Sequence, residues 1–361
     1  CSSDLDLDCG PGPVTAFRFD MDCNEVAECA EESHRPVREG FASRWPGLMH
    51  ACGHDGHAAV GLGLAEVLVS IRRHLRGRIR LIFQPAEEGA RGALPMSEAG
   101  AVDGVDVLFG FHIGFKAEGP GSLICGTQGF LATTKRDVLF SGVPAHAGAA
   151  PEEGKDALLA ACSAVVNLHA ISRNGKGGTR IAVGRLEGGE ARNVIPASAR
   201  LFMETRGETT ELDAYMTAES ERILRASADL WGCACEWRTV GNSAGGGSSP
   251  ELARLIATVA EAMGGWKTVI PMSGFGATED FACLMSRVQA SGGLASYLQV
   301  GTDRAAGHHS DRFDFDETCL GRALELLARL AVRMAGWRAK MGKASAGGEW
   351  SFSSLSTNSD R

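Results

Sequence analysis

The stretch MHACGHDGH, residues 49–57, places one thiol, three imidazoles and one carboxylate within nine positions. These chemical groups are the ligands that zinc and related divalent metals prefer in proteins. A single cysteine or histidine is more often an ordinary core or surface residue, so the stretch alone does not define a site. It becomes informative if the fold brings further ligands to it.

The elements around this stretch alternate between short apolar runs and longer periodic ones. VTAFRFDMD, RIRLIFQ and VDVLFGFH are typical of buried strands, and DGHAAVGLGLAEVLVSIRRHL has apolar residues at helical spacing. We expect Asp55 to cap the amino end of this helix. The strand, helix, strand order predicts an α/β catalytic domain with a mostly parallel sheet flanked by helices.

Further polar residues follow the strands of this predicted sheet. Glu88 comes just after the strand 78–84, His112 follows the strand 105–111, and His309 lies in a late loop. Folds of this kind bind ligands at the carboxyl edge of the sheet, where the strand ends meet. We therefore predict a metal site at this edge. Its candidate ligands are Cys52, His54, Glu88, His112 and His309.

Glu87 stands directly beside the candidate ligand Glu88. If one carboxylate binds metal, its neighbour can face a water molecule and accept its proton. The segment AEEG by itself fits an exposed acidic turn equally well. Together with the other ligands, the pair indicates a general base and a metal ligand in one turn.

The middle of the chain has a different pattern, which predicts a second domain inserted into the first. We expect strands in ATTKRDVLFSG, TRIAVGRLEGG, ASARLFMETRGE and CACEWRTVG, and helices in DALLAACSAVVNLHAI and ELDAYMTAESERILRASADLWG. This order is typical of a ferredoxin-like α+β unit with two helices on one face of a four-stranded sheet. The predicted layout is a catalytic domain in two parts (14–127 and 242–340), a lid and dimerisation domain (128–241), and disordered tails (1–13 and 341–361).

Composition excludes several classes of protein. The 361 residues have a formal net charge of -8 and no basic run interleaved with aromatic residues, which argues against nucleic acid as a partner. No apolar stretch approaches the roughly 20 residues that span a bilayer, so we expect no membrane partner. The eleven cysteines are mostly scattered singly, which is typical of a reducing compartment and predicts a cytoplasmic protein.

Several segments, in matching order and spacing, resemble the metal-dependent aminoacylase, hippurate hydrolase and carboxypeptidase superfamily. They are MHACGHDGH, IFQPAEEGARGA, GFHIG, FSGVPAHAGAAPEEGKDALLAA, RNVIPASA, METRGE, GATEDF and GTDRAAGHHSDRFDFDE. The resemblance implies two divalent metal ions, zinc or manganese, bound by the five candidate ligands, with Glu87 as general base. It favours His309 over the adjacent His308. It also implies that subunits associate through the lid, as a homodimer or as a heterodimer with a homologous subunit.

The resemblance implies roles for residues outside the ligand set as well. His146, in PAHAG, matches an imidazole that stabilises the oxyanion in the active site of the other subunit. Asn193 and Arg206 match positions that hold the carboxylate of the substrate, for which a guanidinium is well suited. Arg192 either binds a second carboxylate or is a solvated surface residue. We expect supporting roles for His50, His57, Glu279 and Asp280.

These features predict an enzyme that acts on a small N-acyl amino acid. The resemblance implies metal-dependent hydrolysis of the amide between an aromatic acyl group and an amino acid, and the resemblance alone implies p-aminobenzoyl-glutamate as the substrate. Two alternatives stay open: a broader N-acyl-amino-acid hydrolase or dipeptidase, and a subunit that needs a homologous partner. The chain has DMDCNEVAEC where the family has DMDAL, and the elements expected before FRFDMD are mostly missing. We therefore expect a fragment or a processed form.

Overall fold

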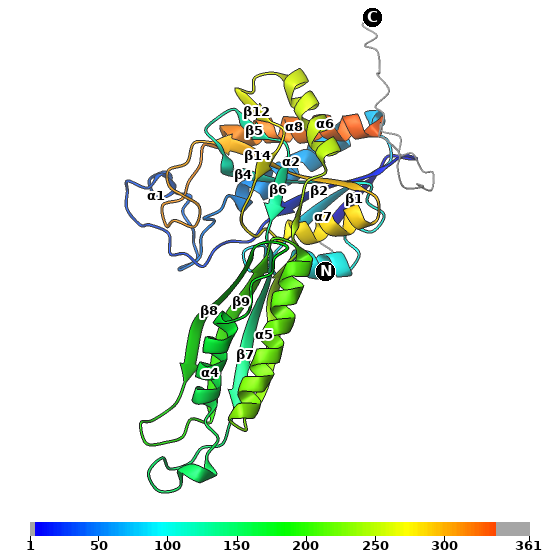
Figure 1. The fold of residues 1–361 in the computed structure, drawn as a ribbon. Coiled ribbons are helices and arrows are strands. Elements are labelled where there is room, and N and C mark those ends of the chain that lie inside the picture. The colour runs from blue at the N-terminus through cyan, green and yellow to red at the C-terminus, as the bar shows by residue number, and fades with distance from the viewer. Residues whose placement is uncertain (1–3, 337–361) are drawn as a thin grey trace, which may run out of the picture.

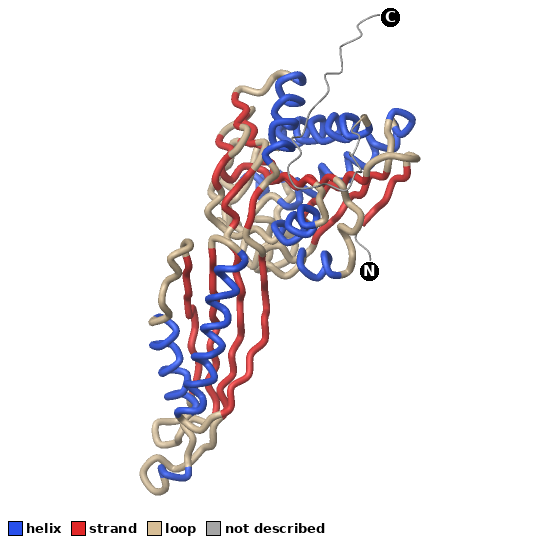
Figure 2. Tube along the Cα trace, turned by 45° about the vertical axis from the view of Figure 1, so that its right-hand side comes forward, coloured by secondary structure: helices blue, strands red, loops and turns tan. Residues whose placement is uncertain are grey.

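The computed structural model describes residues 4–336. These residues form a body around a large sheet and a long arm that extends away from it (Figures 1 and 2). The arm comprises residues 132–243, and the chain contributes to the body both before and after it. This arrangement agrees with the predicted insertion of one unit into another, while the boundaries at 127/128 and 241/242 stay predictions.

The body is organised by a seven-stranded sheet in the order β1-β3-β2-β4-β14-β5-β12. Its central strands β3, β2, β4 and β14 run parallel, whereas β1 and β5 are antiparallel to their neighbours β3 and β14. Because β2, β3 and β4 run in one direction, the loops that follow them meet at the same edge. The strands are β1 (Asp4–Asp8), β2 (Val14–Asp20), β3 (Arg78–Gln84), β4 (Val107–Glu118), β5 (Ser122–Ile124), β12 (Thr268–Ile270) and β14 (Leu294–Thr302).

Helices cover both faces of this sheet. On one face, α2 (His54–Ser70), α6 (Pro250–Met263) and α8 (Thr318–Ala335) pack over an apolar core that includes Phe17 and Phe109. On the other face, α3 (Ala93–Glu98) and α7 (Phe281–Ala290) pack over Ile82 and Leu108. Alternate residues of a strand point to opposite faces, so strands covered on both sides read as the continuous apolar runs seen in the sequence.

The arm has the predicted ferredoxin-like architecture. Its strands form an antiparallel sheet in the order β10-β7-β9-β8, and α4 and α5 pack on one face of it. Both helices begin at a side-chain cap, because Asp156 and Thr209 accept the backbone N–H of Leu159 and Leu212. The elements are β7 (Ala132–Ser141), η2 (Pro151–Glu153), α4 (Ala157–His169), β8 (Thr179–Gly188), β9 (Ser198–Gly207), α5 (Thr210–Leu230) and β10 (Ala234–Ser243).

Several short elements complete the body, and the sequence pattern did not predict them. A three-stranded sheet in the order β11-β6-β13 includes the segments that directly precede and follow the arm. Such short pairings depend on tertiary contacts rather than on local periodicity, so periodicity could not reveal them. They are α1 (Arg35–Glu39), η1 (Arg72–His74), β6 (Thr127–Phe130), β11 (Gly246–Gly247) and β13 (Ser273–Gly274).

Two expectations about the chain are corrected here. The predicted disorder of 1–13 is wrong for residues 4–8, because β1 pairs antiparallel with β3 and Asp6 lies 2.7 Å from the guanidinium of Arg80. The predicted cap at Asp55 is also wrong, since α2 begins at His54 and Asp55 lies within its first turn. The predicted disordered segment 341–361 lies outside the described residues.

Candidate metal centre

The first two candidate ligands lie where a loop enters α2. Gly53 between them has a φ of +91°, which glycine adopts without strain, so the chain can turn sharply at this point. Cys52 and His54 are both buried. His54 Nδ1 donates to the carbonyl oxygen of Asp22 at 3.1 Å, and His54 Nε2 is buried without a hydrogen-bond partner.

His112, on β4, is oriented by the backbone in the same manner. Its Nδ1 donates to the carbonyl oxygen of Ile113 at 2.9 Å, and its Nε2 lies 3.5 Å from the Sγ of Cys52. A hydrogen bond to one ring nitrogen is the usual device that aims the other nitrogen at a metal.

Glu88, in the loop after β3, and His309, in the loop before α8, lie next to each other. Glu88 Oε2 lies 3.2 Å from His309 Nε2, and Glu88 Oε1 is buried without a hydrogen-bond partner. The backbone N–H of His309 donates to the carbonyl oxygen of Ala51 at 2.7 Å, which ties the late loop to the MHACGHDGH stretch. The two loops are more than 200 residues apart in sequence, so only the fold could establish this contact.

The structure thus brings all five predicted ligands into one cluster. Ligand atoms of Cys52, His54 and His112 lie within 4.8 Å of one another, and so do those of Cys52, Glu88 and His309. Because Cys52 belongs to both groups, the geometry suits two neighbouring ions. The unpartnered atoms of His54 and Glu88 are what a cation would satisfy, and the mixture of sulfur, nitrogen and oxygen donors fits a borderline divalent metal.

Two other histidines near this cluster, His57 and His308, are hydrogen-bonded to the protein, His57 through both ring nitrogens and His308 through one. His57 donates from Nδ1 to Asp20, and its Nε2 accepts the backbone N–H of Ile113 at 2.9 Å. His308 Nε2 accepts the backbone N–H of Phe115 at 3.2 Å. His57 therefore supports the site rather than completing it.

The electrostatics of the cluster favour a bound cation. Burial raises the pKa of the Cys52 thiol well above its ordinary value, and the charge of Glu88 raises it further. Burial lowers the pKa of His54, but Asp20 and Asp22 outweigh burial and raise this pKa to about 9. A protonated thiol and a charged imidazole are poor ligands, whereas a divalent ion that binds here displaces both protons.

Glu87 lies in the turn between this cluster and a second group of carboxylates. Its ligand oxygen lies within 4.8 Å of those of Glu279 and Asp280, and a further group joins it to His54 and Glu88. Burial raises the pKa of Glu87 well above its usual range, and the charges of Glu279 and Asp280 raise it further. A carboxyl group with a raised pKa can accept and return a proton near neutral pH.

A fully buried arginine holds that second group in place. Arg18, on β2, contacts Asp20, Glu279 at 3.0 Å and Asp280 at 3.3 Å, and it donates to Gln84 at 2.8 Å. Burial lowers the pKa of Arg18, but the three carboxylates outweigh burial and raise it above its usual value. Glu279 and Asp280 therefore support the site by binding Arg18, and neither is a simple helix cap.

Sequence reasoning missed two aspartates that connect these groups. Asp20 joins Arg18 to His57, and Asp22 accepts the backbone N–H of Glu88 at 3.1 Å while its carbonyl accepts from His54. Both belong to FRFDMD, at the end of β2. A polar residue just past a strand end was the signal that identified Glu88 and His112, so the same signal could have found them.

Backbone strain is concentrated around this cluster. Among the described residues, the non-glycine positions with positive φ are Ala86, Ala90, Phe115 and His309, at 53° to 65°. Two of them bracket the pair of glutamates, and Phe115 lies three residues after His112. Each such conformation costs about 1 to 2 kcal/mol, and strain of this kind tends to occur at functional sites.

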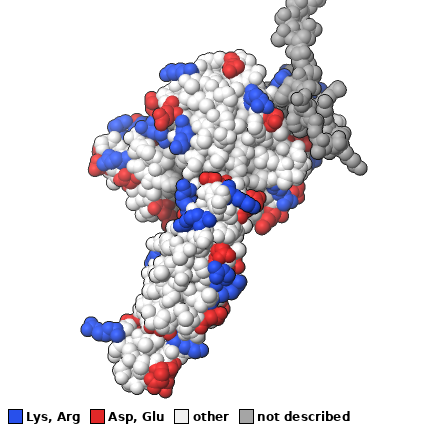
Figure 3. Space-filling model, viewed as in Figure 1, with Lys and Arg blue, Asp and Glu red and all other residues white. Residues whose placement is uncertain are grey.

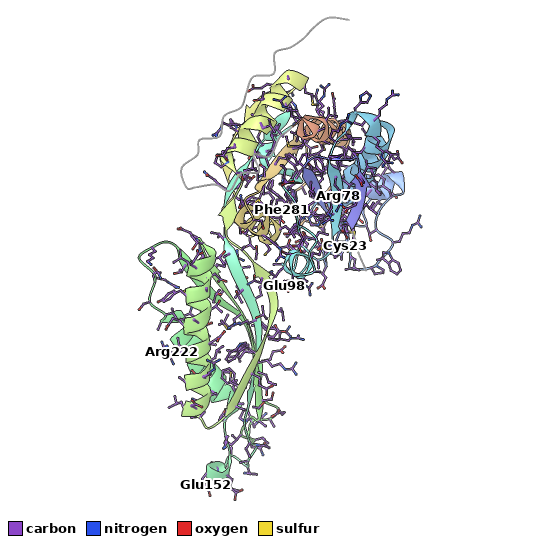
Figure 4. The ribbon with its side chains drawn as sticks, turned by 90° about the vertical axis from the view of Figure 1, so that its right-hand side faces the viewer. Cys23, Arg78, Glu98, Glu152, Arg222 and Phe281 are labelled. Atoms are coloured by element: carbon purple, nitrogen blue, oxygen red, sulfur yellow. The ribbon has the colours of Figure 1, made fainter. Side chains whose placement is uncertain are left out.

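The arm residues predicted to bind substrate lie at its two opposite ends. His146 and Asn193 are neighbours at the outer tip, where the N–H of Ala147 donates to the carbonyl of Asn193 at 3.0 Å. Figure 4 shows Glu152 at this tip, far from Cys23 in the body. A single chain therefore does not bring His146 or Asn193 to the metal cluster.

Arg206 lies at the body end of β9, roughly 27 Å along the strand from its first residue. Its Nε donates to Glu204 at 2.8 Å and the side chain is about one-third exposed. Lys and Arg side chains gather where the arm meets the body on the face seen in Figure 3. Arg192 is exposed next to Asn193 at the tip, so the structure does not bring Arg192 and Arg206 together.

The model of Peptidase family M20/M25/M40 matches residues 16–333. The chain belongs to this family. Indole-3-acetyl-aspartic acid hydrolase of Enterobacter agglomerans and a p-aminobenzoyl-glutamate hydrolase subunit of Escherichia coli are each 46% identical to it over 328 residues, which cover 90% of this chain and 75% of each relative. As a member of this family, the chain is a hydrolase that acts on amide bonds.

Solved structures agree with this assignment. The aminobenzoyl-glutamate utilization protein of Klebsiella pneumoniae has a TM-score of 0.75 and 37% identity, and the match covers 91% of this chain and 74% of that one. The YXEP protein of Bacillus subtilis, described as a dinuclear metal-binding peptidase of family M20, has a TM-score of 0.66 and 26% identity, with 92% and 84% covered. Within residues 4–336, no helix of this M20 chain is long and apolar enough to cross a membrane.

Metal removal is expected to destabilise the protein. Adding zinc or manganese at 100 times its Kd to chelator-treated protein should stabilise the folded state by about 2.7 kcal/mol, because metal binds only the assembled cluster. Thermal unfolding with and without metal measures this. Cys52→Ala and His54→Ala should lose the shift, whereas His169→Ala, an exposed residue of the arm, should keep it. An equal shift in all variants would contradict the site.

Replacing the buried arginine should cost far more than replacing a surface arginine. Arg18→Met leaves Asp20, Glu279 and Asp280 without their cation, so the free energy of unfolding should fall by about 3 to 5 kcal/mol. Arg287→Met removes only an exposed pair with Asp103 and should cost less than about 1 kcal/mol. Urea denaturation of the two variants compares them, and similar losses would show that the Arg18 network is not a major source of stability.

Proposed function

We propose that this chain hydrolyses the amide bond between an aromatic acyl group and an acidic amino acid, and that its substrate is p-aminobenzoyl-glutamate. The products are p-aminobenzoate and glutamate. The observation that supports a hydrolytic site most strongly is the clustering of five metal-ligand side chains beside the partly buried Glu87. The substrate class is supported by the two 46% identical relatives, which are named for conjugates of aspartate and of glutamate.

In this proposal the five clustered side chains hold two divalent ions, zinc or manganese. The thiolate of Cys52 favours zinc, the softer of the two. When bound, such ions polarise a carbonyl group and lower the pKa of water to about 7. The ligands are Cys52, His54, Glu88, His112 and His309.

Glu87 acts as the general base and then as the general acid. Its position between the ligand cluster and the carboxylates of Glu279 and Asp280 partly removes it from water, and this desolvation together with the two neighbouring charges raises its pKa. It takes a proton from the attacking water and returns it to the nitrogen of the leaving amino acid. Both transfers use the same carboxyl group, so the site is restored at the end of the reaction.

The remaining groups come from the arm, which we assign to residues 128–241 as a lid and dimerisation domain. Arg206, near the body, binds the α-carboxylate of the substrate of its own subunit. His146 and Asn193 lie too far out to act in their own subunit, so they serve the site of a second subunit. There His146 stabilises the oxyanion and Asn193 helps to bind the carboxylate. Arg192, at the same tip, remains a candidate for a further carboxylate contact.

The second subunit is either another copy of this chain or a homologous chain. The Escherichia coli relative is named as one subunit of its enzyme, which favours a heteromeric assembly. We place the enzyme in the cytoplasm, because the described cysteines are all free thiols and Cys23 and Cys162 are exposed. A second candidate substrate is indole-3-acetyl-aspartate, since the relative named for that conjugate is equally similar.

Glu87→Gln is expected to slow hydrolysis strongly without loss of metal. The variant keeps the shape of the side chain but removes the base, so kcat for p-aminobenzoyl-glutamate should fall about 100- to 10,000-fold. Release of p-aminobenzoate measures this, beside assays of indole-3-acetyl-aspartate and a plain dipeptide. Glu98→Gln, an exposed position on α3, serves as the control. If metal-loaded wild type cleaves only the dipeptide, the proposed substrate class is wrong.

A mixing experiment tests whether two copies of this chain share sites. Glu87→Gln and His146→Ala should each be inactive alone, because each lacks one part of every site. In an equal mixture, half of the dimers are mixed and each contains one intact site, so activity should return to about one quarter of wild type. No recovery would contradict a shared site in a homodimer and would favour a heteromeric partner.

A further inference from the structure

Arg304 lies in the loop between β14 and α8, five residues before the candidate ligand His309. Its side chain is only partly exposed, and within residues 4–336 no carboxylate, ring or carbonyl oxygen pairs with its guanidinium. The other described arginines that lack an acidic or aromatic partner are all exposed. Arg304 is therefore the exception that needs an explanation, because a partly buried charge without a partner is unfavourable.

The position of Arg304 next to β4 places it beside the metal cluster. Gly114, two residues after His112, has a φ of +72°, and a Cβ there would lie 3.2 Å from Arg304 Cδ and 3.4 Å from Arg304 Nε. The same point is 3.4 Å from His308 Nε2. The absence of a side chain at Gly114 thus lets Arg304 and His308 both lie close to the backbone that follows His112.

His308 contributes a second unsatisfied donor next to Arg304. Its Nε2 accepts the backbone N–H of Phe115, so in the neutral ring the proton is on Nδ1. That Nδ1 is buried and has no hydrogen-bond partner. The ring is held in this orientation by contacts with Phe115 at 5.5 Å and Phe313 at 5.0 Å between ring centroids. The His308 ring and the Arg304 side chain meet at Gly114, and an N–H donor and a guanidinium can together bind a carboxylate.

We propose that Arg304, assisted by His308 Nδ1, binds the side-chain carboxylate of the substrate's acidic amino acid and so determines specificity for glutamate or aspartate conjugates. This inference rests on the proposed function, in which Arg206 holds the α-carboxylate. It assigns the second carboxylate to the body of the protein, next to His112, rather than to Arg192 at the tip of the arm. Arg304 is a binding residue and takes no part in the proton transfers.

The test compares a glutamate conjugate with its neutral isostere. For Arg304→Gln, kcat/KM for p-aminobenzoyl-glutamate should fall about 10- to 100-fold, the usual range for loss of a charge-assisted hydrogen bond. For p-aminobenzoyl-glutamine, kcat/KM should change less than about twofold, because its side chain carries no charge to lose. Arg304→Lys, which keeps the charge, should recover part of the preference. Arg312→Gln, in the same loop but paired with the exposed Glu31, should leave both values unchanged.

The outcomes separate this inference from the proposed function. Equal loss on both conjugates would overturn the assignment, since Arg304 would then act on the α-carboxylate or on folding, and no loss on either would overturn it as well. Calorimetric binding of both conjugates to metal-loaded Glu87→Gln, with and without Arg304→Gln, gives a reading that needs no turnover. If wild type fails to hydrolyse either conjugate while Arg304→Gln selectively weakens binding of the glutamate conjugate, the proposed function fails and this inference stands.

Discussion

The burial of Arg18 among carboxylates is the interaction on which the site depends. A guanidinium with no exposure to water is tolerated only if acidic groups surround it, and Asp20, Glu279 and Asp280 do so from two elements that are far apart in the sequence. The ion pairs fix the loop before α7 against the end of β2. Through Asp20 they also orient His57, which in turn accepts a hydrogen bond from the backbone beside His112.

Negative charge exceeds positive charge around this network, and that imbalance explains the chemistry of the site. Arg18 offers one fixed charge, whereas Asp20, Glu87, Glu279 and Asp280 lie close together in or near the interior. The unbalanced carboxylates raise the pKa of neighbouring acids and favour cations at the ligand cluster. A ligand cluster that favours cations and a glutamate able to carry a proton are thus consequences of one electrostatic arrangement.

The body holds the ligand loops rigidly, whereas the arm carries other side chains far away from them. Parallel strands packed on both faces hold the ligand loops, including strained positions such as Ala86 and His309, in one geometry. The antiparallel arm carries the imidazole of His146 and the amide of Asn193 to its outer tip. At that tip, neither side chain can reach the ligand cluster of its own chain. In the function proposed above, these two side chains serve the site of a second subunit, and the contacts of the arm then couple assembly to activity.

The sequence by itself determined the strand and helix order of the body, the ferredoxin-like arm, and the family. It also predicted the five candidate ligands, which the structure brings into one cluster, because strand ends converge in a parallel sheet and because ligand residue types are few. It missed the role of Arg18, since a charged residue within an apolar strand has no local sign of its partners, and it wrongly predicted disorder for β1, whose partner strand lies some 70 residues away. Only the tertiary structure decided which nitrogen of each histidine faces the cluster, that Arg304 is unpaired beside Gly114, and that His146 is remote from Glu87. These properties depend on contacts between distant segments, and local pattern carries no information about such contacts.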